Sequence, residues 1–368
     1  MEHEFTLVIK NILIRNFPAT ANDIFDKSHI IKYLNYKTKS VGRGSKSRGS
    51  FANHYAIYVL VEDYIAKGFL NNEEAYLDYE GAKYTDLLTR MRQLPFGQKL
   101  QNHALNSRMN EEFKKLFPDV TYQPILRDLA TKRYWFNDNL LRIATGNTYR
   151  NIALTIVEII DAYIDAKRSA FETFISYTKQ LAEIPNSNSQ QAIDFIIRQL
   201  QPNIDARVFE IVSYAILKSY YSNTTIYWGW HPEQLNQDKL TLYKTGRTNA
   251  NDGGIDFVMK PLGRFFQVTE TLDFKKYFLD IDKIQRYPIS FVVKTEMIEE
   301  EIYKRLESNA ENTYRIKIIV ERYMRSIEEI INIPKLTEIF QKQVTESKTQ
   351  YIMEEIVKQS MLEFNYED

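Results

Sequence analysis

Apolar residues recur every three or four positions along two long segments in the first half of the chain, residues 51–70 and 151–184. This spacing places the apolar side chains on one face of a helix, so both segments are predicted to be helices packed against a core. We expect residues 1–188 to form a mainly α-helical domain. The polar stretch PNSNSQQ, residues 185–191, interrupts the helical pattern and is the best candidate for a domain boundary.

Beyond this boundary, residues 189–368 combine helical and extended patterns. Helical spacing occurs at residues 191–201, 205–221 and 273–287, and extended runs occur at residues 224–230, 240–246, 255–260, 264–270 and 288–295. The turn residues Pro261, Leu262 and Gly263 join two of the extended runs as an antiparallel hairpin. After residue 296 the pattern is helical almost to the end. This order predicts an α/β fold in which a mixed sheet is flanked by helices.

Composition narrows the possible classes of protein. Hydrophobic residues make up 44% of the chain and charged residues 26%, which is typical of a soluble globular protein. No apolar run is long enough to cross a membrane and the N-terminus lacks the features of a secretory signal, so we expect a cytoplasmic protein without a membrane partner. The chain has no Cys, and its five His are too far apart for a short metal-binding motif. Catalysis would therefore depend on carboxylates, Lys or hydroxyl groups.

Charge is distributed unevenly, although the net charge is zero. No acidic residue occurs between Lys27 and Glu62. Within this region the stretch KTKSVGRGSKSRGS, residues 37–50, contains three Gly and four Ser and is predicted to be a mobile loop. A local concentration of positive charge is typical of a site that binds phosphate groups. The basic residues of this loop are Lys37, Lys39, Arg43, Lys46 and Arg48.

Two common catalytic motifs are absent. The stretch GRGSKS, residues 42–47, superficially resembles a P-loop, but Ser45 separates the Gly from the Lys and no strand precedes it. No GxSxG sequence occurs, so the nucleophile of a serine hydrolase is not supported either. We therefore expect no nucleotide cofactor.

The hairpin carries a more informative set of polar residues. Asp256 stands at the start of its first strand, shortly after Gly253 and Gly254, and Gln267 stands on the second strand. Because the turn folds the second strand back beside the first, Asp256 and Gln267 are predicted to be neighbours. Alternation places Gln267 and Thr269 on one face, and the three residues are expected to line a cleft. Oxygen ligands that include an ionised carboxylate suit a Mg²⁺ ion that also holds water and a phosphate oxygen.

The stretch IDF-x8-FQVT resembles the D-x(n)-(E/Q)-x-K signature of the PD-(D/E)xK nuclease superfamily, in the Gln-containing form found in many type II restriction endonucleases. Asp256 matches the Asp of the signature and Gln267 matches its Glu or Gln. The resemblance covers residues 205–295, where the order of helices and strands also agrees. It implies that Glu210, on the helix before the strands, and the carbonyl of Val268 are further metal ligands.

The sequence departs from the signature at one catalytic position, where Thr269 replaces the Lys of the family. A threonine side chain cannot supply the positive charge that orients the attacking water or stabilises the transition state. Lys260, Lys275 and Lys276 are the neighbouring residues that could supply this charge instead.

The resemblance implies a sequence-specific double-stranded DNA endonuclease of a restriction–modification system. Such an enzyme hydrolyses phosphodiester bonds with a Mg²⁺-activated water and commonly acts as a homodimer. The basic loop would then contact the DNA backbone from the N-terminal domain, and the C-terminal helices would supply the dimer surface.

Two alternative functions remain open. A non-catalytic DNA-binding protein with a decayed nuclease core would explain Thr269, and a structural or protein-interaction module would explain the many Tyr and Phe residues.

Overall fold

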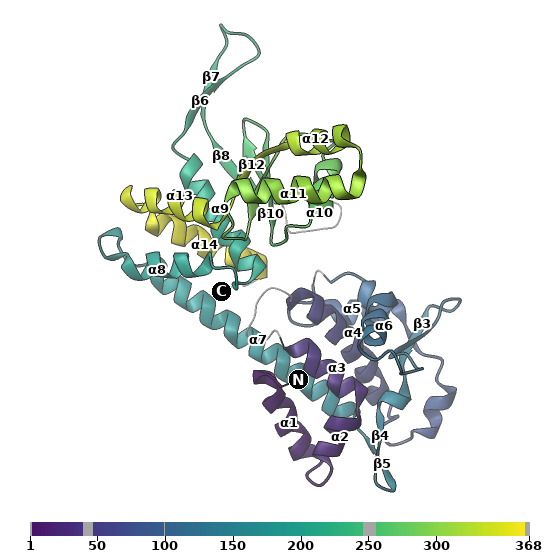
Figure 1. Ribbon diagram of the computed structural model, residues 1–368. Helices are drawn as coiled ribbons and strands as arrows, with labels where there is room; N and C mark the ends of the chain where they lie inside the picture. The colour runs from purple at the N-terminus through teal and green to yellow at the C-terminus, as the bar shows by residue number, and fades with distance from the viewer. Residues whose placement is uncertain (1, 40–46, 99, 246–254, 365–368) are drawn as a thin grey trace. The chain divides into compact units, whose positions relative to one another are not determined.

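The computed structural model describes residues 2–39, 47–98, 100–245 and 255–364. For residues 47–50 and 363–364 it describes the backbone alone. The chain divides into two compact units, Met1–Glu172 and Thr173–Asp368 (Figure 1). Each unit has its own hydrophobic core and is described by itself.

The N-terminal unit is mainly helical. Its helices are α1 (Glu4–Asn16), α2 (Ala21–Lys27), α3 (His29–Thr38), α4 (Ser47–Ala66), α5 (Tyr84–Gln93), α6 (Met109–Leu116) and most of α7 (Ala153–Ala182), with short helical turns at η2 (Glu74–Asp78), η3 (Ala104–Arg108) and η4 (Asp138–Leu140). Its strands are β1 (Ala82–Lys83), β2 (Ile125–Asp128), β3 (Arg133–Phe136), β4 (Arg142–Thr145) and β5 (Thr148–Asn151). They form an antiparallel sheet of order β1-β3-β2 and a separate β4–β5 hairpin.

Aromatic residues of α4 and α7 form the centre of this core. Tyr55 and Tyr163 are fully buried, and the His54 ring stacks on Tyr163 with centroids 4.7 Å apart. The helical character of the unit agrees with the sequence pattern, but the small strands were not expected. Strands of two to four residues contain too few positions to produce a recognisable two-residue alternation.

The C-terminal unit contains a five-stranded mixed sheet. Its helices are η5 (Asn186–Asn188), α8 (Gln190–Gln199), α9 (Ala206–Tyr221), α10 (Phe274–Lys283), α11 (Glu299–Tyr314), α12 (Lys317–Arg325), α13 (Ile333–Thr345) and α14 (Thr349–Phe364). Its strands are β6 (Thr225–Trp228), β7 (Asn236–Lys239), β8 (Thr241–Lys244), β9 (Phe257–Lys260), β10 (Arg264–Thr269), β11 (Ile289–Val293) and β12 (Ile327–Ile331). The sheet order is β12-β11-β10-β9-β8, with β10, β11 and β12 parallel and the other pairs antiparallel. The predicted mixed α/β architecture is confirmed.

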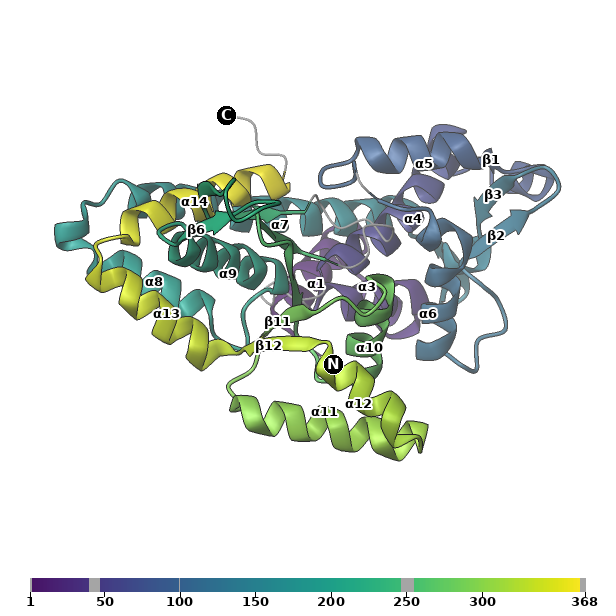
Figure 2. The same cartoon turned by 90° about the horizontal axis from the view of Figure 1, so that it is seen from above.

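Helices cover both faces of this sheet (Figure 2). On one face, α9, α13 and α14 pack against Phe266 and Val292 of the sheet. On the other face, α10, α11 and α12 pack against Phe291 and Val293. All five residues of β11 are buried, because a central strand that is covered on both faces has no solvent side. The sheet is therefore a rigid support for groups held at the ends of its strands.

The β9–β10 hairpin forms as the sequence predicts. Val258 lies opposite Phe265 and Phe257 lies opposite Phe266 in an antiparallel register. Gly263 has a φ of 66°, a left-handed conformation that glycine adopts without strain. The hairpin register fixes which residues of the two strands are neighbours.

The division between the units falls inside α7, earlier than the expected boundary between residues 188 and 189. Rings near the end of α7 pack against α8, with Phe174 and Tyr177 centroids 5.9 and 5.6 Å from that of Phe195. The polar stretch PNSNSQQ is thus a connection between two helices of one unit. Packing, rather than local polarity, sets the boundary.

Two strands of the second unit differ from the expectation. The chain after residue 296 is not helical throughout, because β12 adds a parallel edge strand beside β11. Its sequence IEEII has apolar ends and an acidic centre, a pattern that suits a helix equally well. The strand β6 pairs only with β7 and does not join the five-stranded sheet. None of the helices in the described ranges has the length and apolar character needed to span a bilayer.

Candidate active site

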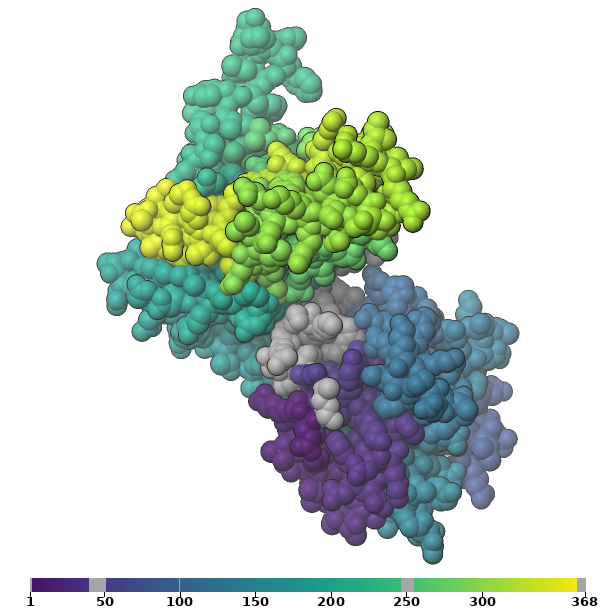
Figure 3. Space-filling model, viewed as in Figure 1, coloured from purple at the N-terminus to yellow at the C-terminus, as the bar shows by residue number. Residues whose placement is uncertain are grey.

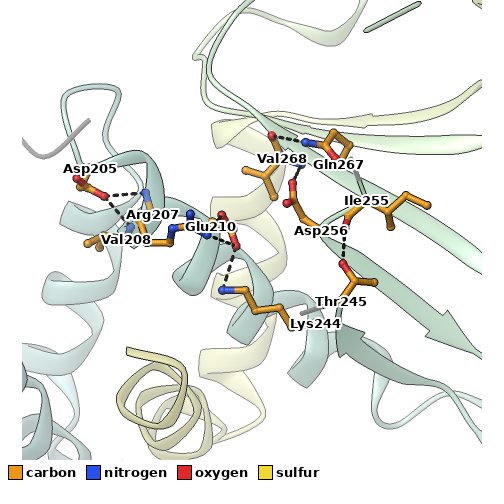
Figure 4. Close-up of polar contacts among 10 residues, drawn as sticks. All are labelled: Asp205, Arg207, Val208, Glu210, Lys244, Thr245, Ile255, Asp256, Gln267 and Val268. Atoms are coloured by element: carbon orange, nitrogen blue, oxygen red, sulfur yellow. Dashed lines mark hydrogen bonds and ion pairs between the residues drawn. The ribbon is translucent and has the colours of Figure 1, made fainter. Parts of the chain in front are cut away.

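Asp256 lies immediately before β9, and its backbone is fixed on both sides. Its N–H donates to the carbonyl of Phe266 at 2.9 Å, and its carbonyl accepts the N–H of Thr245 at 3.0 Å. The carboxylate accepts the backbone N–H of Val268 at 2.8 Å (Figure 4). The hairpin therefore holds this carboxylate against the last residues of β10.

Glu210 approaches from α9, one turn after the start of the helix. The helix begins at Asp205, whose carboxylate accepts the backbone N–H groups of Arg207 and Val208. The Glu210 carboxylate forms ion pairs with the guanidinium of Arg207 at 3.0 Å and the ammonium of Lys244 at 2.9 Å. Figure 4 shows Glu210 on the side of α9 that faces Asp256.

Burial and the neighbouring Glu210 carboxylate both change the acidity of Asp256. Burial of the Asp256 carboxyl raises its pKa from 3.8 to about 7, and the negative charge of Glu210 acts in the same direction. The hydrogen bond from Val268 and the charges of Arg207 and Lys244 act in the opposite direction but are weaker. Asp256 therefore changes its charge near neutral pH, as groups in functional sites often do.

Gln267 and Val268 lie on the strand beside Asp256 (Figure 4). The Gln267 side chain is 8% exposed, and its amide nitrogen donates to the carbonyl of Val268 at 3.2 Å. The Oε1 atom of Gln267 is buried and has no hydrogen-bond partner among the described residues. A buried polar atom without a partner is costly, and such atoms in folded proteins call for an explanation.

Thr269 points away from the carboxylates. Its buried hydroxyl accepts the ammonium of Lys276 at 3.2 Å, so its side chain faces α10, whereas Glu210 belongs to the opposite side of the sheet. Of the other lysines named from the sequence, Lys275 is exposed on α10 and the Lys260 ammonium lies over the ring of Tyr243, 5.7 Å from its centroid. The structure therefore brings Asp256, Val268 and Glu210 together. The Gln267 side chain leaves β10 on the same face as Thr269, and its amide nitrogen reaches the group through the Val268 carbonyl.

Sequence reasoning missed the two cations of the site. Lys244 is the last residue of β8 and lies opposite Phe257, the residue after Asp256. Arg207 precedes Glu210 by three residues, which places both on one face of α9. The spacing between Arg207 and Glu210 is a sequence signal, but nothing in the sequence shows that β8 pairs with β9.

The donor atoms of this group fit a hard divalent cation. The described part of the chain contains no cluster of three His, Cys, Asp or Glu side chains able to hold a metal. A metal would therefore depend on the Asp256 and Glu210 carboxylates together with the Val268 carbonyl oxygen, all of the type that Mg²⁺ prefers. It would also reduce the repulsion between the carboxylates.

The predicted DNA-contacting residues lie in the N-terminal unit, partly within helices. The two ends of the predicted loop, residues 37–50, are helical instead, because α3 continues to Thr38 and α4 begins at Ser47. The Lys37 ammonium forms an ion pair with Glu112 at 2.7 Å, and its side chain is largely buried. Lys39 is exposed, Arg43 and Lys46 lie outside the described residues, and Arg48 lies in the first turn of α4, where only the backbone is described.

Comparison with known proteins gave no match, whether with protein-family models, with curated proteins or with solved structures. Any functional conclusion must therefore rest on the residues themselves and on the geometry around Asp256.

Proposed function

We propose that this protein is a Mg²⁺-dependent endonuclease that cuts double-stranded DNA, with chemistry like that of the type II restriction enzymes its hairpin resembles. The observation that carries the proposal is the placement of the Asp256 and Glu210 carboxylates beside the Val268 backbone, where the charge of Glu210 helps to raise the Asp256 pKa. Two largely buried carboxylates with a neutral carbonyl oxygen form a site suited to a divalent cation and a phosphate group.

In this proposal each group of the site has one task. Asp256, Glu210 and the Val268 carbonyl would hold Mg²⁺, which when bound supplies charge for the phosphate and a more acidic water. Gln267 holds the Val268 carbonyl in position through its amide nitrogen. Lys244 supplies the positive charge that Thr269 lacks, because its ammonium already lies 2.9 Å from a carboxylate of the site. Arg207 holds the Glu210 side chain in position through its own ion pair at 3.0 Å.

The substrate and the assembly follow from the same resemblance. Cleavage of both strands at a symmetric sequence is most simply achieved by two active sites, so we propose a homodimer. The basic residues between 37 and 48 neutralise phosphates of the bound DNA, with Lys39, Arg43, Lys46 and Arg48 carrying most of this contact. Lys37 contributes less, because Glu112 already occupies its ammonium. The cytoplasm is the compartment in which such an enzyme meets DNA.

Incubation with mapped plasmid DNA tests the proposal directly. Discrete bands in Mg²⁺ that disappear in EDTA would support it and would also reveal the recognition sequence. Salt-sensitive binding to DNA without cleavage in Mg²⁺ would instead support the non-catalytic alternative, which Thr269 favours. Neither binding nor cleavage would point to a structural or interaction module.

A further inference from the structure

The hairpin formed by β6 and β7, residues 225–239, projects from the C-terminal unit, and we call it the arm (Figure 3). Its two strands pair only with each other, and every residue of β7 is exposed. An isolated two-stranded hairpin is marginally stable and buries little of its own surface. The arm therefore contributes little to the core of the unit, and its exposed surface is available to bind a partner.

The tip of the arm presents aromatic side chains to solvent. Trp230 is 90% exposed, and Tyr227 and Leu235 are also exposed. The tip is compact, since a Cβ atom at Gly229 would lie 2.2 Å from the carbonyl oxygen of Gln234. Exposed aromatic residues that a tight turn holds in place are characteristic of surfaces that bind another molecule.

The charge of the arm argues against a phosphate backbone as its target. Its charged residues are two acids, Glu233 and Asp238, and one base, Lys239. Contacts with the DNA backbone depend on an excess of Lys and Arg, which the arm does not have. A surface that is both apolar and basic would complement it better.

Such a surface occurs on the same unit, where α11 turns into α12; we call residues 314–325 the corner. Ile316, Ile318 and Ile319 are exposed there, with Ile318 71% exposed. The corner has one acidic residue, Glu321, and four basic residues: Arg315, Lys317, Arg322 and Arg325. All four basic side chains are exposed, and none forms an ion pair with another described residue. The corner is rigid, because Tyr314 stacks on the buried ring of Phe278 with centroids 5.9 Å apart.

We propose that the arm of one copy of this chain binds the corner of a second copy. The arm is aromatic and slightly acidic, whereas the corner is aliphatic and basic, so the two surfaces are complementary in both respects. Figures 1 and 2 show them on separate parts of the C-terminal unit, so they do not meet within one chain. A reciprocal exchange makes two identical contacts and gives a closed, two-fold symmetric dimer. The inference rests on these surfaces alone and does not depend on nuclease activity.

Sedimentation equilibrium on the full chain tests the association. We expect a species of twice 43.5 kDa that dissociates on dilution. Trp230→Ser and Ile318→Asp change exposed side chains and should leave the fold intact. A central aromatic anchor contributes about 30-fold to affinity, so losing it from both contacts should raise the dimer dissociation constant about 1000-fold. Leu279→Asp, at a similarly exposed apolar residue of α10, is the matched control and should dimerise normally.

A mixing experiment tests the pairing itself. A homodimer of either variant has no contact in which both the arm and the corner are intact. A mixed dimer of Trp230→Ser and Ile318→Asp has one such contact, between the arm of Ile318→Asp and the corner of Trp230→Ser. The mixture should therefore associate about 30-fold more tightly than either variant alone. A chain carrying both substitutions should gain nothing from mixing with wild type, because that pair has no complete contact.

Three results would overturn the proposal. The first is a wild-type protein that stays monomeric at all accessible concentrations. The second is loss of dimer in both variants without recovery on mixing, which would show that the two surfaces do not bind each other. The third is an unchanged dimer in Trp230→Ser together with weaker DNA binding, which would identify DNA as the partner of the arm.

Discussion

Two clusters of charged residues lie on the same sheet, and they differ in how well their partners are matched. The first is the candidate site beside Asp256, and the second surrounds Arg264 at the start of β10. The Arg264 guanidinium donates to the hydroxyl of Ser290 at 2.9 Å and pairs with Glu329 and, at 3.2 Å, with Glu328. Lys335 adds an ion pair with Glu329 at 2.7 Å.

The Arg264 cluster is complete, whereas the site is not. No side-chain atom of Arg264, Glu328, Glu329 or Lys335 is among the buried atoms that lack a hydrogen-bond partner in the described ranges. Beside Asp256, by contrast, the Gln267 oxygen has no such partner and the Asp256 pKa is raised to about 7. A complete cluster stabilises the fold, and an incomplete one indicates a place for a ligand. Four predictions test this distinction.

Removing the Asp256 carboxylate should have the largest effect. Asp256→Ala deletes a proposed metal ligand from the start of a strand without opening a core cavity, so cleavage should fall by about 10³-fold or more while the fold and DNA binding persist. Plasmid cleavage rates and circular dichroism would measure both. The surface variant Asp194→Ala is the control. Wild-type cleavage by Asp256→Ala would show that the site is elsewhere.

Replacing Lys244 should lower the cleavage rate more than replacing a lysine near Thr269. Lys244→Met retains the apolar stem but removes the ammonium from the site, and we expect cleavage at saturating DNA to fall about 100-fold. Lys276→Met should change the rate little, because its ammonium contacts the hydroxyl on the other side of the sheet. Single-turnover rates would separate the two variants. The reverse order would place the catalytic cation on α10.

Arg264 should affect stability without affecting chemistry. Arg264→Met removes the ion pairs with Glu328 and Glu329 and leaves Glu329 only Lys335 as a partner. Breaking such a half-buried cluster should cost about 2 kcal/mol in the free energy of unfolding. Urea denaturation would measure this loss. Lys342→Met, which breaks the exposed ion pair with Glu338, should change stability little. Cleavage per folded molecule should be unchanged in both variants, and a specific loss in Arg264→Met would refute the division into two kinds of cluster.

The pH dependence of stability should also reveal the site. The folded protein keeps a proton on Asp256 up to about pH 7, whereas the unfolded chain releases it near pH 3.8, so stability without metal falls as the pH rises between these values. Asp256→Asn removes this loss and should be more stable than wild type by about 4 kcal/mol at pH 8 but similar to it below pH 4. Urea titrations in EDTA from pH 3.5 to 8 would measure the difference. A difference that stays constant with pH would contradict the raised pKa.

The sequence predicted those parts of the fold and site that depend on local pattern. The β9–β10 hairpin, the helix carrying Glu210 and the proximity of Asp256 to Gln267 follow from alternation, helical spacing and one turn. The pairing of β8 with β9 joins strands separated by more than ten residues, so the arrival of Lys244 could not be predicted. Alternation placed Gln267 and Thr269 on one face, but the covering of that face by α10 rather than α9 is likewise not a local property.

The order of elements along the chain also determines when each core can form during synthesis. The buried residues of the N-terminal core all lie between residues 5 and 164, so this core is complete once α7 has emerged. In the C-terminal unit, α9 shares a core with α13 and α14, which are synthesised more than 100 residues later. Such long-range contacts form slowly and leave apolar surface exposed meanwhile. The N-terminal unit can therefore fold on the nascent chain, while the face of α9 that carries Phe209 and Val212 must wait until residue 356 is available.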